Sequence, residues 1–343
     1  MGFFILWRFD RNVIARFNST GNTTEMRKNN LPIAVLVSLL ALANPCLLLA
    51  QQDSPTSGEK AQPTGSDHDN ESTASSTEAL QKATQNPVAN LISVPLQNNS
   101  NFNIGPYDRT QDVLNIQPVI PANVSKDWMV ITRVIQPIVW QPYPNQTTGG
   151  EYGLGDMNPT FFLSPRKPGK LIWGVGPALV IPTATNTVLG QGKFSLGPSA
   201  VALAQPGHWT VGALANNVWS VAGDGSRPDV NQMLLQYFVN YNLKKGWYLS
   251  VSPIITANWE ASSGNVWTVP VGGGVGRIMK LGFQPVNLTA QFYGNAVHPT
   301  GASPWGMRLQ IAFLFPKLSA KEKELLMEEK LKELQREQQQ QPH

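Results

Sequence analysis

Apolar and polar side chains alternate along short segments between about residue 91 and residue 315. The clearest segment runs from Trp247 to Trp259: one face is apolar with a tryptophan at each end, and the other carries mainly tyrosine, serine, threonine and asparagine. Successive side chains of a β-strand point to opposite faces, and a strand that crosses a membrane needs roughly 9–11 residues with aromatic side chains at both interfaces. The pattern therefore predicts extended strands with one apolar and one polar face.

Counting these segments gives about twelve strands, and an even number returns both ends of a barrel to the same side of the membrane. The segments lie near residues 91–104, 110–120, 128–140, 156–164, 171–182, 194–204, 208–221, 232–243, 247–259, 265–278, 285–296 and 305–315.

A soluble β-sandwich also alternates, but two features favour a barrel. The connections alternate in length, as in outer-membrane barrels: Gln141–Asp156, Thr183–Lys193, Ala222–Gln232 and Asn295–Pro304 are long, and Ala204–His208, Leu243–Trp247 and Lys280–Pro285 are short. Charged residues make up only 14% of the chain, against roughly 25% in soluble domains. We therefore predict an all-β fold, a transmembrane antiparallel up-and-down β-barrel over residues 86–317, with a polar and nearly uncharged interior.

The N-terminal region carries the pattern of an exported protein. A basic stretch from Met26 precedes an apolar run that ends at Ala50, which predicts a signal peptide over residues 26–50, with a membrane anchor helix as the alternative. Residues 1–25 precede this complete signal and are interpreted as a probable non-native start extension. Residues 51–85 predict a disordered linker with a short helix from about Ser75 to Thr84. This linker is interpreted as a tether, with a plug inside the barrel as the alternative.

The C-terminal region is rich in glutamate, lysine and leucine and predicts a periplasmic helical tail over residues 318–343. A weak self-association or docking helix is the alternative interpretation.

Eight prolines fall inside the predicted strands, where each removes a donor from the β-ladder. They are Pro95, Pro118, Pro137, Pro159, Pro177, Pro198, Pro253 and Pro270. A belt of bulges or kinks at one height of the barrel is one explanation.

The polar faces define candidate site residues that line the lumen. They are Asn115, Gln117, Arg133, Asn158, Gln236, Asn240, Asn242, Thr256, Asn258, Asn287, Gln291 and Arg308. Arg133 is placed inward because an arginine at the lipid midplane costs roughly 2–4 kcal/mol, and this placement turns Ile131 and Ile135 inward too. The predicted aromatic girdle comprises Trp173, Trp209, Tyr237, Tyr241, Trp247, Trp259, Phe313 and Phe315.

Several segments together also resemble a known family. They read NPVANLISVPLQNNSNFNIGP, VLNIQPVIP, GLGDMNPTFFLSPRKPGKLIWGVGP, RPDVNQMLLQYFVNYNL and GWYLSVSPIITANWEA. In this order they resemble, over about residues 86 to 317, the bacterial outer-membrane proteins of the meta-pathway of phenol degradation, which are often labelled transporters or neuromedin U. The resemblance implies a barrel for the passage of small compounds, aromatic or hydrophobic ones among them, and it brings no catalytic or binding residues with it.

The leading functional hypothesis is a passive outer-membrane channel or transporter for small solutes, and the alternative is a closed structural or docking barrel. An enzyme is not expected, because His208 and His298 fall at opposite ends of the predicted barrel and no G-x-S-x-G element occurs. We expect no cofactor, no metal and no nucleic acid. The expected partners are outer-membrane lipid, a small-molecule solute and, during insertion, the barrel-assembly machinery. The oligomeric state is left open.

Overall fold

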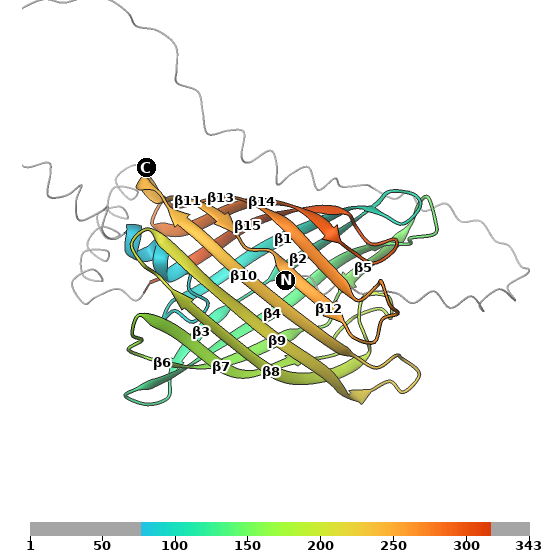
Figure 1. Ribbon diagram of the computed structural model, residues 1–343, viewed down its shortest axis with the longest axis horizontal. Helices are drawn as coiled ribbons and strands as arrows, with labels where there is room; N and C mark the ends of the chain where they lie inside the picture. The colour runs from blue at the N-terminus through green and yellow to red at the C-terminus, as the bar shows by residue number, and fades with distance from the viewer. Residues whose placement is uncertain (1–76, 317–343) are drawn as a thin grey trace, which may run out of the picture. The chain divides into compact units, whose positions relative to one another are not determined.

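The computed structural model describes residues 77–316, which form one β-barrel with a helical segment, residues 77–84, at one end (Figure 1). The strands are β1 (Ile92–Ile104), β2 (Arg109–Ile116), β3 (Val119–Asn123), β4 (Trp128–Pro142), β5 (Gly150–Leu154), β6 (Asn158–Pro165), β7 (Leu171–Val180), β8 (Lys193–Ala204), β9 (Trp209–Gly223), β10 (Asn231–Asn242), β11 (Trp247–Val251), β12 (Ile254–Asn258), β13 (Trp267–Leu281), β14 (Gln284–Val297) and β15 (Trp305–Phe315), with a 3-10 turn, η1 (Lys244–Gly246), between β10 and β11.

The fifteen strand segments form a closed barrel of twelve strands, because three of the twelve strands are each interrupted and consist of two segments. The pairs β2 and β3, β5 and β6, and β11 and β12 each continue in one direction along the same neighbours. The wall closes where β1 pairs antiparallel with β15, from Ile92 opposite Phe315 to Phe102 opposite Trp305. The predicted fold, a twelve-stranded antiparallel barrel, is confirmed.

Two of the prolines lie at these interruptions: Pro118 follows β2, and Pro253 separates β11 from β12. Pro270 lies where the register of β13 against β14 shifts. Pro198 lies opposite Pro177, and the register of β8 is the same on either side of it. A proline cannot donate to its neighbour, so each of them removes one donor from the ladder.

The two ends of the barrel differ in their connections. At the turn end, which holds residues 124–127, 166–170, 205–208, 243–246 and 282–283, the connections are short; at the loop end, which holds residues 105–108, 143–149, 181–192, 224–230, 259–266 and 298–304, most are longer. One predicted loop needs correction. The connection Gln141–Asp156 contains β5, which pairs with the last residues of β4 and shortens the loop to residues 143–149. Gly150 and Gly153 of β5 interrupt the alternation of apolar and polar side chains, so the sequence pattern did not indicate this strand.

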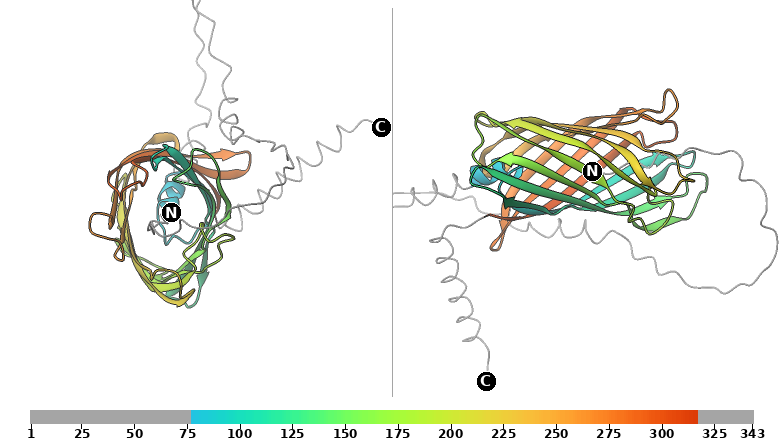
Figure 2. Two further views of the ribbon diagram at one scale, coloured as in Figure 1. Left: turned by 90° about the vertical axis from the view of Figure 1, so that its right-hand side faces the viewer. Right: turned by 90° about the horizontal axis from the view of Figure 1, so that it is seen from below.

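The segment before β1 lies at the turn end, inside the ring of strands when the barrel is seen along its axis (Figure 2). Gln81, Val88 and Leu91 are all buried there. No helix among the described residues has the length and apolar character needed to cross a membrane. The predicted extension, signal peptide, linker residues before 77 and C-terminal helix lie outside the described residues.

Candidate functional site

The interior of the barrel holds a cavity of about 200 Å³ beside the segment of residues 83–91. Its opposite wall comes from strands that are far apart in sequence, chiefly β1, β10, β11, β14 and β15. These strands meet because the barrel closes between β1 and β15, so inward positions of the first and last strands become neighbours.

Seven of the predicted lumen residues lie on the wall of this cavity. They are Gln117, Arg133, Gln236, Asn240, Asn287, Gln291 and Arg308. Thr256 lines a second, smaller cavity of about 60 Å³. Their assignment as residues that contact a solute stays a prediction.

Four predicted lumen residues line neither cavity. Asn115 is fully buried, and both polar atoms of its side chain lack a hydrogen-bond partner. Asn158 donates to the Asp156 carbonyl oxygen (2.8 Å), and Asn242 accepts from Gln85 (2.8 Å). Asn258 closes β12 and accepts a hydrogen bond from the Glu260 N–H (3.2 Å) at the loop end.

Arg308 has the most elaborate environment of the site. Its guanidinium donates to Asn99 Oδ1 (3.1 Å), to the Ser252 carbonyl oxygen (3.0 Å) and, at 3.4 Å, to Gln291 Oε1. It also lies 5.0 Å from the centre of the Tyr293 ring, a cation–π arrangement. Arg308 borders both cavities, so it stands at the partition between them along the barrel.

Arg133, the second charge of the site, donates to Gln117 Oε1 at 2.9 Å. It lies on β4, and the burial of Ile131 and Ile135 on either side confirms that this face of β4 points inward. The argument from the cost of an arginine in lipid therefore gave the correct orientation for this strand.

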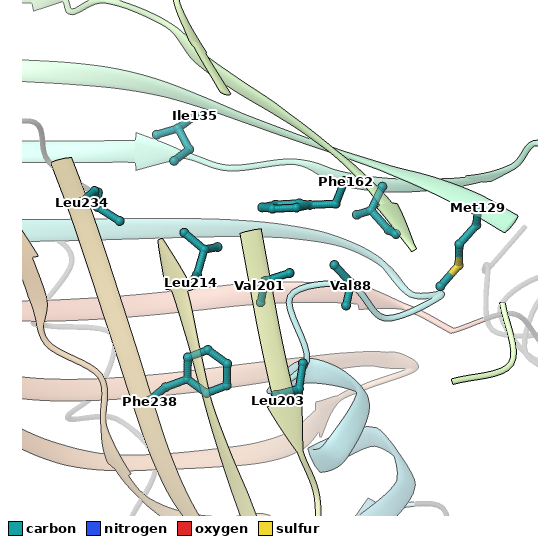
Figure 3. Packing of buried hydrophobic residues seen from close by; sticks show 10 residues of the cluster. Val88, Met129, Ile135, Phe162, Val201, Leu203, Leu214, Leu234 and Phe238 are labelled. Atoms are coloured by element: carbon teal, nitrogen blue, oxygen red, sulfur yellow. The ribbon is translucent and has the colours of Figure 1, made fainter. Parts of the chain in front are cut away.

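The expectation of a polar interior is wrong for one side of the barrel. An apolar cluster fills the inner faces of β4, β6, β8, β9 and β10, and Figure 3 shows nine of its residues labelled. Its members are Val88, Met129, Ile131, Ile135, Phe162, Val201, Leu203, Leu214, Leu234 and Phe238. The cluster forms because Val88 enters the barrel from the segment before β1 and gives these side chains an apolar partner away from water.

Three hydrogen bonds hold residues 77–91 in place at the turn end. Gln81 donates to the Trp247 carbonyl oxygen (3.0 Å), Gln85 donates to Asn242 Oδ1 (2.8 Å), and Gln205 donates to the Lys82 carbonyl oxygen (2.8 Å). Together with the burial of Val88 and Leu91, these bonds make the segment a plug. The plug, which the sequence left as the alternative to a tether, is what the structure shows for the described residues 77–91.

The loop between β7 and β8 folds inward at the other end. Leu189 is 1% exposed and packs with Val113 and Val139 on the inner wall. The carboxylate of Asp156 fixes the loop by accepting from the Ala184 N–H (3.2 Å) and the Gln191 N–H (2.6 Å). The lumen is therefore narrowed from both ends.

Several residues of the site were missed from the sequence. Gln97 and Asn99 on β1, and Ser250 and Ser252 beside β11, line the cavities. The β1 residues escaped notice because the intervening Asn98 and Ser100 are polar too. Those side chains contact Asp112, with the Ser100 hydroxyl donating to its carboxylate at 2.5 Å, so β1 lacks a clean two-residue period.

The outer face of the barrel exposes many large apolar side chains and carries aromatic pairs towards both ends. At the turn end, Trp209 lies against Tyr241 with ring centres 4.7 Å apart, and at the loop end Trp259 meets Trp267 at 5.3 Å. Trp173, Trp247, Phe313 and Phe315 lie on strands near the turn end. Tyr237, predicted in the girdle, lies in the middle of β10 instead.

No group of side chains suited to a metal ion occurs within residues 77–316. His208 lies beside Tyr241 at the turn end, and His298 lies beside the Pro299 carbonyl oxygen at the loop end.

A closed antiparallel barrel with an apolar outer face, aromatic side chains towards both ends and short turns on one side has the architecture of bacterial outer-membrane barrels. Among solved structures, the chain is similar to an outer membrane channel from Pseudomonas putida F1, with a TM-score of 0.51 and 15% identity, over 66% of this chain and 95% of that one. It also matches the outer membrane phospholipase A of Escherichia coli, with a TM-score of 0.35 and 12% identity, over 66% of this chain and 97% of the phospholipase. At these identities the likeness to the channel establishes the fold. No family model matches the sequence, and no curated protein matches it.

Proposed function

We propose that the protein is an outer-membrane channel for the passive passage of small solutes, closed in this structure by the plug of residues 77–91. The observation that carries the proposal is the row of two cavities inside the barrel, one beside the plug and one nearer the loop end, with Arg308 between them. A path through the barrel needs the plug, the side chains at the partition and the inward loop around Leu189 to move, while the hydrogen-bonded wall stays as it is.

The same proposal includes the cellular setting. An apolar outer face with aromatic bands fits an outer-membrane lipid environment, and the fold is similar to that of the Pseudomonas putida channel. Export through the signal peptide of residues 26–50, insertion by the barrel-assembly machinery, and membership of the family of the meta-pathway of phenol degradation complete the proposal. The resemblance to that family, together with the apolar cluster, favours aromatic or hydrophobic solutes. We propose no catalytic role, since the two histidines of the barrel lie at opposite ends.

The size of the cavities favours a second candidate, a closed barrel with a structural or docking role. At about 200 and 60 Å³ they are smaller than the roughly 300–1,000 Å³ of sites for drug-sized ligands. Phe162, Tyr248 and Tyr293 are buried, and their rings occupy space inside the barrel.

Reconstitution separates the two candidates. The purified full chain is placed in planar bilayers and in liposomes, and single-channel conductance and swelling are measured with neutral solutes of increasing size. The channel proposal predicts intermittent conductance steps and swelling with the smallest solutes. A complete lack of both, also in a variant whose plug is released, would establish the closed barrel.

A further inference from the structure

Two guanidinium groups face the larger cavity without any carboxylate to balance them. Arg133 and Arg308 both lie on its wall, and their hydrogen-bond acceptors are amide side chains and one backbone carbonyl. No aspartate or glutamate lines the cavity within the described residues 77–316. Charges taken out of water are normally paired, so this arrangement leaves a place for an anion.

The cavity also offers hydrogen-bond donors that the barrel itself leaves unused. Gln117 is 2% exposed, its Oε1 accepts from Arg133, and its Nε2 has no partner. The Nδ2 of Asn99, beside Arg308 on the wall of the second cavity, is buried without a partner as well. Donors left unpaired in a buried site cost free energy, and a bound carboxylate is an acceptor that meets them.

Part of the cavity wall is apolar, where it borders the apolar cluster and the end of the plug. Phe238 and Leu91 line it, and so does Val119, which packs against the cluster. Its volume of about 200 Å³ compares with the roughly 150 Å³ of an apolar cavity that holds benzene. A ligand with one acidic group and one ring fits both the size of the cavity and its combination of charged and apolar lining residues.

From these observations we propose that the cavity binds small organic acids with an apolar body, of which benzoate is the simplest aromatic example. Arg308 and Arg133 recognise the carboxylate, and the side of Phe238 and Val119 receives the ring. The assignment of the acid as the transported solute rests on the proposed channel function. The binding site itself does not, because binding does not require passage. Planar guanidinium groups suit a carboxylate since they donate two parallel hydrogen bonds.

The test is a binding titration of the detergent-solubilised full chain in chloride-free buffer, by calorimetry, with benzoate, benzyl alcohol and acetate. Benzyl alcohol keeps the ring without the charge, and acetate keeps the charge without the ring. We expect benzoate to bind roughly tenfold or more tightly than either, as loss of one charge-assisted contact implies. Equal binding of benzyl alcohol would overturn the role of the arginines, and equal binding of acetate would reduce the site to a general anion site and overturn the proposal.

Variants place the effect on named residues. Arg308→Gln and, separately, Arg133→Gln should each weaken benzoate binding roughly tenfold, while Arg308→Lys should retain part of it. The matched control is Arg277→Gln, because Arg277 is next to Trp247 on the outer face, 5.0 Å from its ring. Heat-modifiable mobility on gels verifies that each variant is folded. Wild-type affinity in the folded Arg308 and Arg133 variants would contradict the proposal.

Conductance measured on the same preparation keeps this proposal apart from the channel function. Benzoate binding without conductance, in the wild type and also in a variant whose plug is released, supports the site and refutes the channel. Conductance without benzoate binding supports the channel and refutes the site.

Discussion

The plug gives the sharpest prediction, through the substitution Val88→Asp. Val88 is 1% exposed and lies within the apolar cluster beside Phe162, Val201 and Leu203. The change removes about 1.5–3 kcal/mol of side-chain burial, and leaving a carboxylate there unpaired costs several kcal/mol more. The hydrogen bonds from the plug to Trp247, Asn242 and Gln205 contribute about 0.5–1.5 kcal/mol each and are not strengthened by the substitution, so the whole loss shifts the equilibrium towards the released plug.

The expected result is release of the plug while the barrel wall stays intact. A loss of at least about 3 kcal/mol raises the population of the released state more than roughly 100-fold, since 1.4 kcal/mol corresponds to tenfold. A cysteine placed at Ala83, which lines the cavity, reports the release through its rate of maleimide labelling in a Cys46→Ser background. Conductance of the reconstituted variant should rise in parallel.

Val124→Asp is the matched control for this experiment. It makes the same chemical change in the turn between β3 and β4, at the same end of the barrel, where Val124 is 58% exposed. The reasoning is refuted if Val88→Asp and Val124→Asp show the same labelling rate and the same conductance in folded protein.

Four further predictions test other parts of the structure. Tyr248→Phe removes the hydroxyl that hydrogen-bonds Asn287 (2.8 Å) and Thr289 (2.9 Å) inside the barrel. It should lower the free energy of unfolding, measured in denaturant titrations, by about 1–3 kcal/mol, and an unchanged midpoint would indicate that water replaces the lost hydroxyl. Gly276→Val should lower the free energy of unfolding by about 1–3 kcal/mol through overpacking, because a Cβ there would lie 2.1 Å from the Tyr248 ring. Adding Tyr248→Ala should relieve much of this loss, and strictly additive effects of the two substitutions would contradict the clash. Leu189→Ala should release the inward loop of residues 182–192, since truncating a buried leucine costs about 2–5 kcal/mol of stability. Faster amide hydrogen exchange, confined to that loop, is the expected result. Hydrogen bonds from the Ser226 hydroxyl and N–H lower the pKa of Asp224 in the loop after β9, so they stabilise the turn above the ordinary aspartate range and are lost as the pH falls through the lowered pKa. Amide protection factors in the turn, which correct for the intrinsic pH dependence of exchange, should fall at acidic pH in the wild type and should stay constant in Asp224→Asn.

The wall of the barrel was predictable because its information is local. In the segment Trp247 to Trp259 the alternating polarity of the side chains indicates which face each side chain occupies. In the structure Trp247 and Trp259 are exposed and Tyr248 is buried. The number of strands follows from counting such segments, and their even number places both ends of the barrel on the same side.

The interior was less predictable because it depends on contacts between distant parts of the chain. On β8 the bulky side chains of Val201 and Leu203 point inward, while the small Ala200 and Ala202 point outward. Alternation shows that such a strand has two faces, but with apolar residues on both it does not show which one meets water. Val88, more than a hundred positions earlier in the sequence, enters the barrel and provides an apolar partner for the inner face of β8.

The order of assembly is constrained by the seam between β1 and β15. These are the first and last strands of the wall, so the ring stays open until the final strand is in place. The plug directly precedes β1, and it must therefore already lie on the inner side of the curling sheet at closure or enter afterwards through the turn end. A chain that stops before Trp305 would expose unpaired edges on β1 and β14, which are ready templates for pairing with other chains.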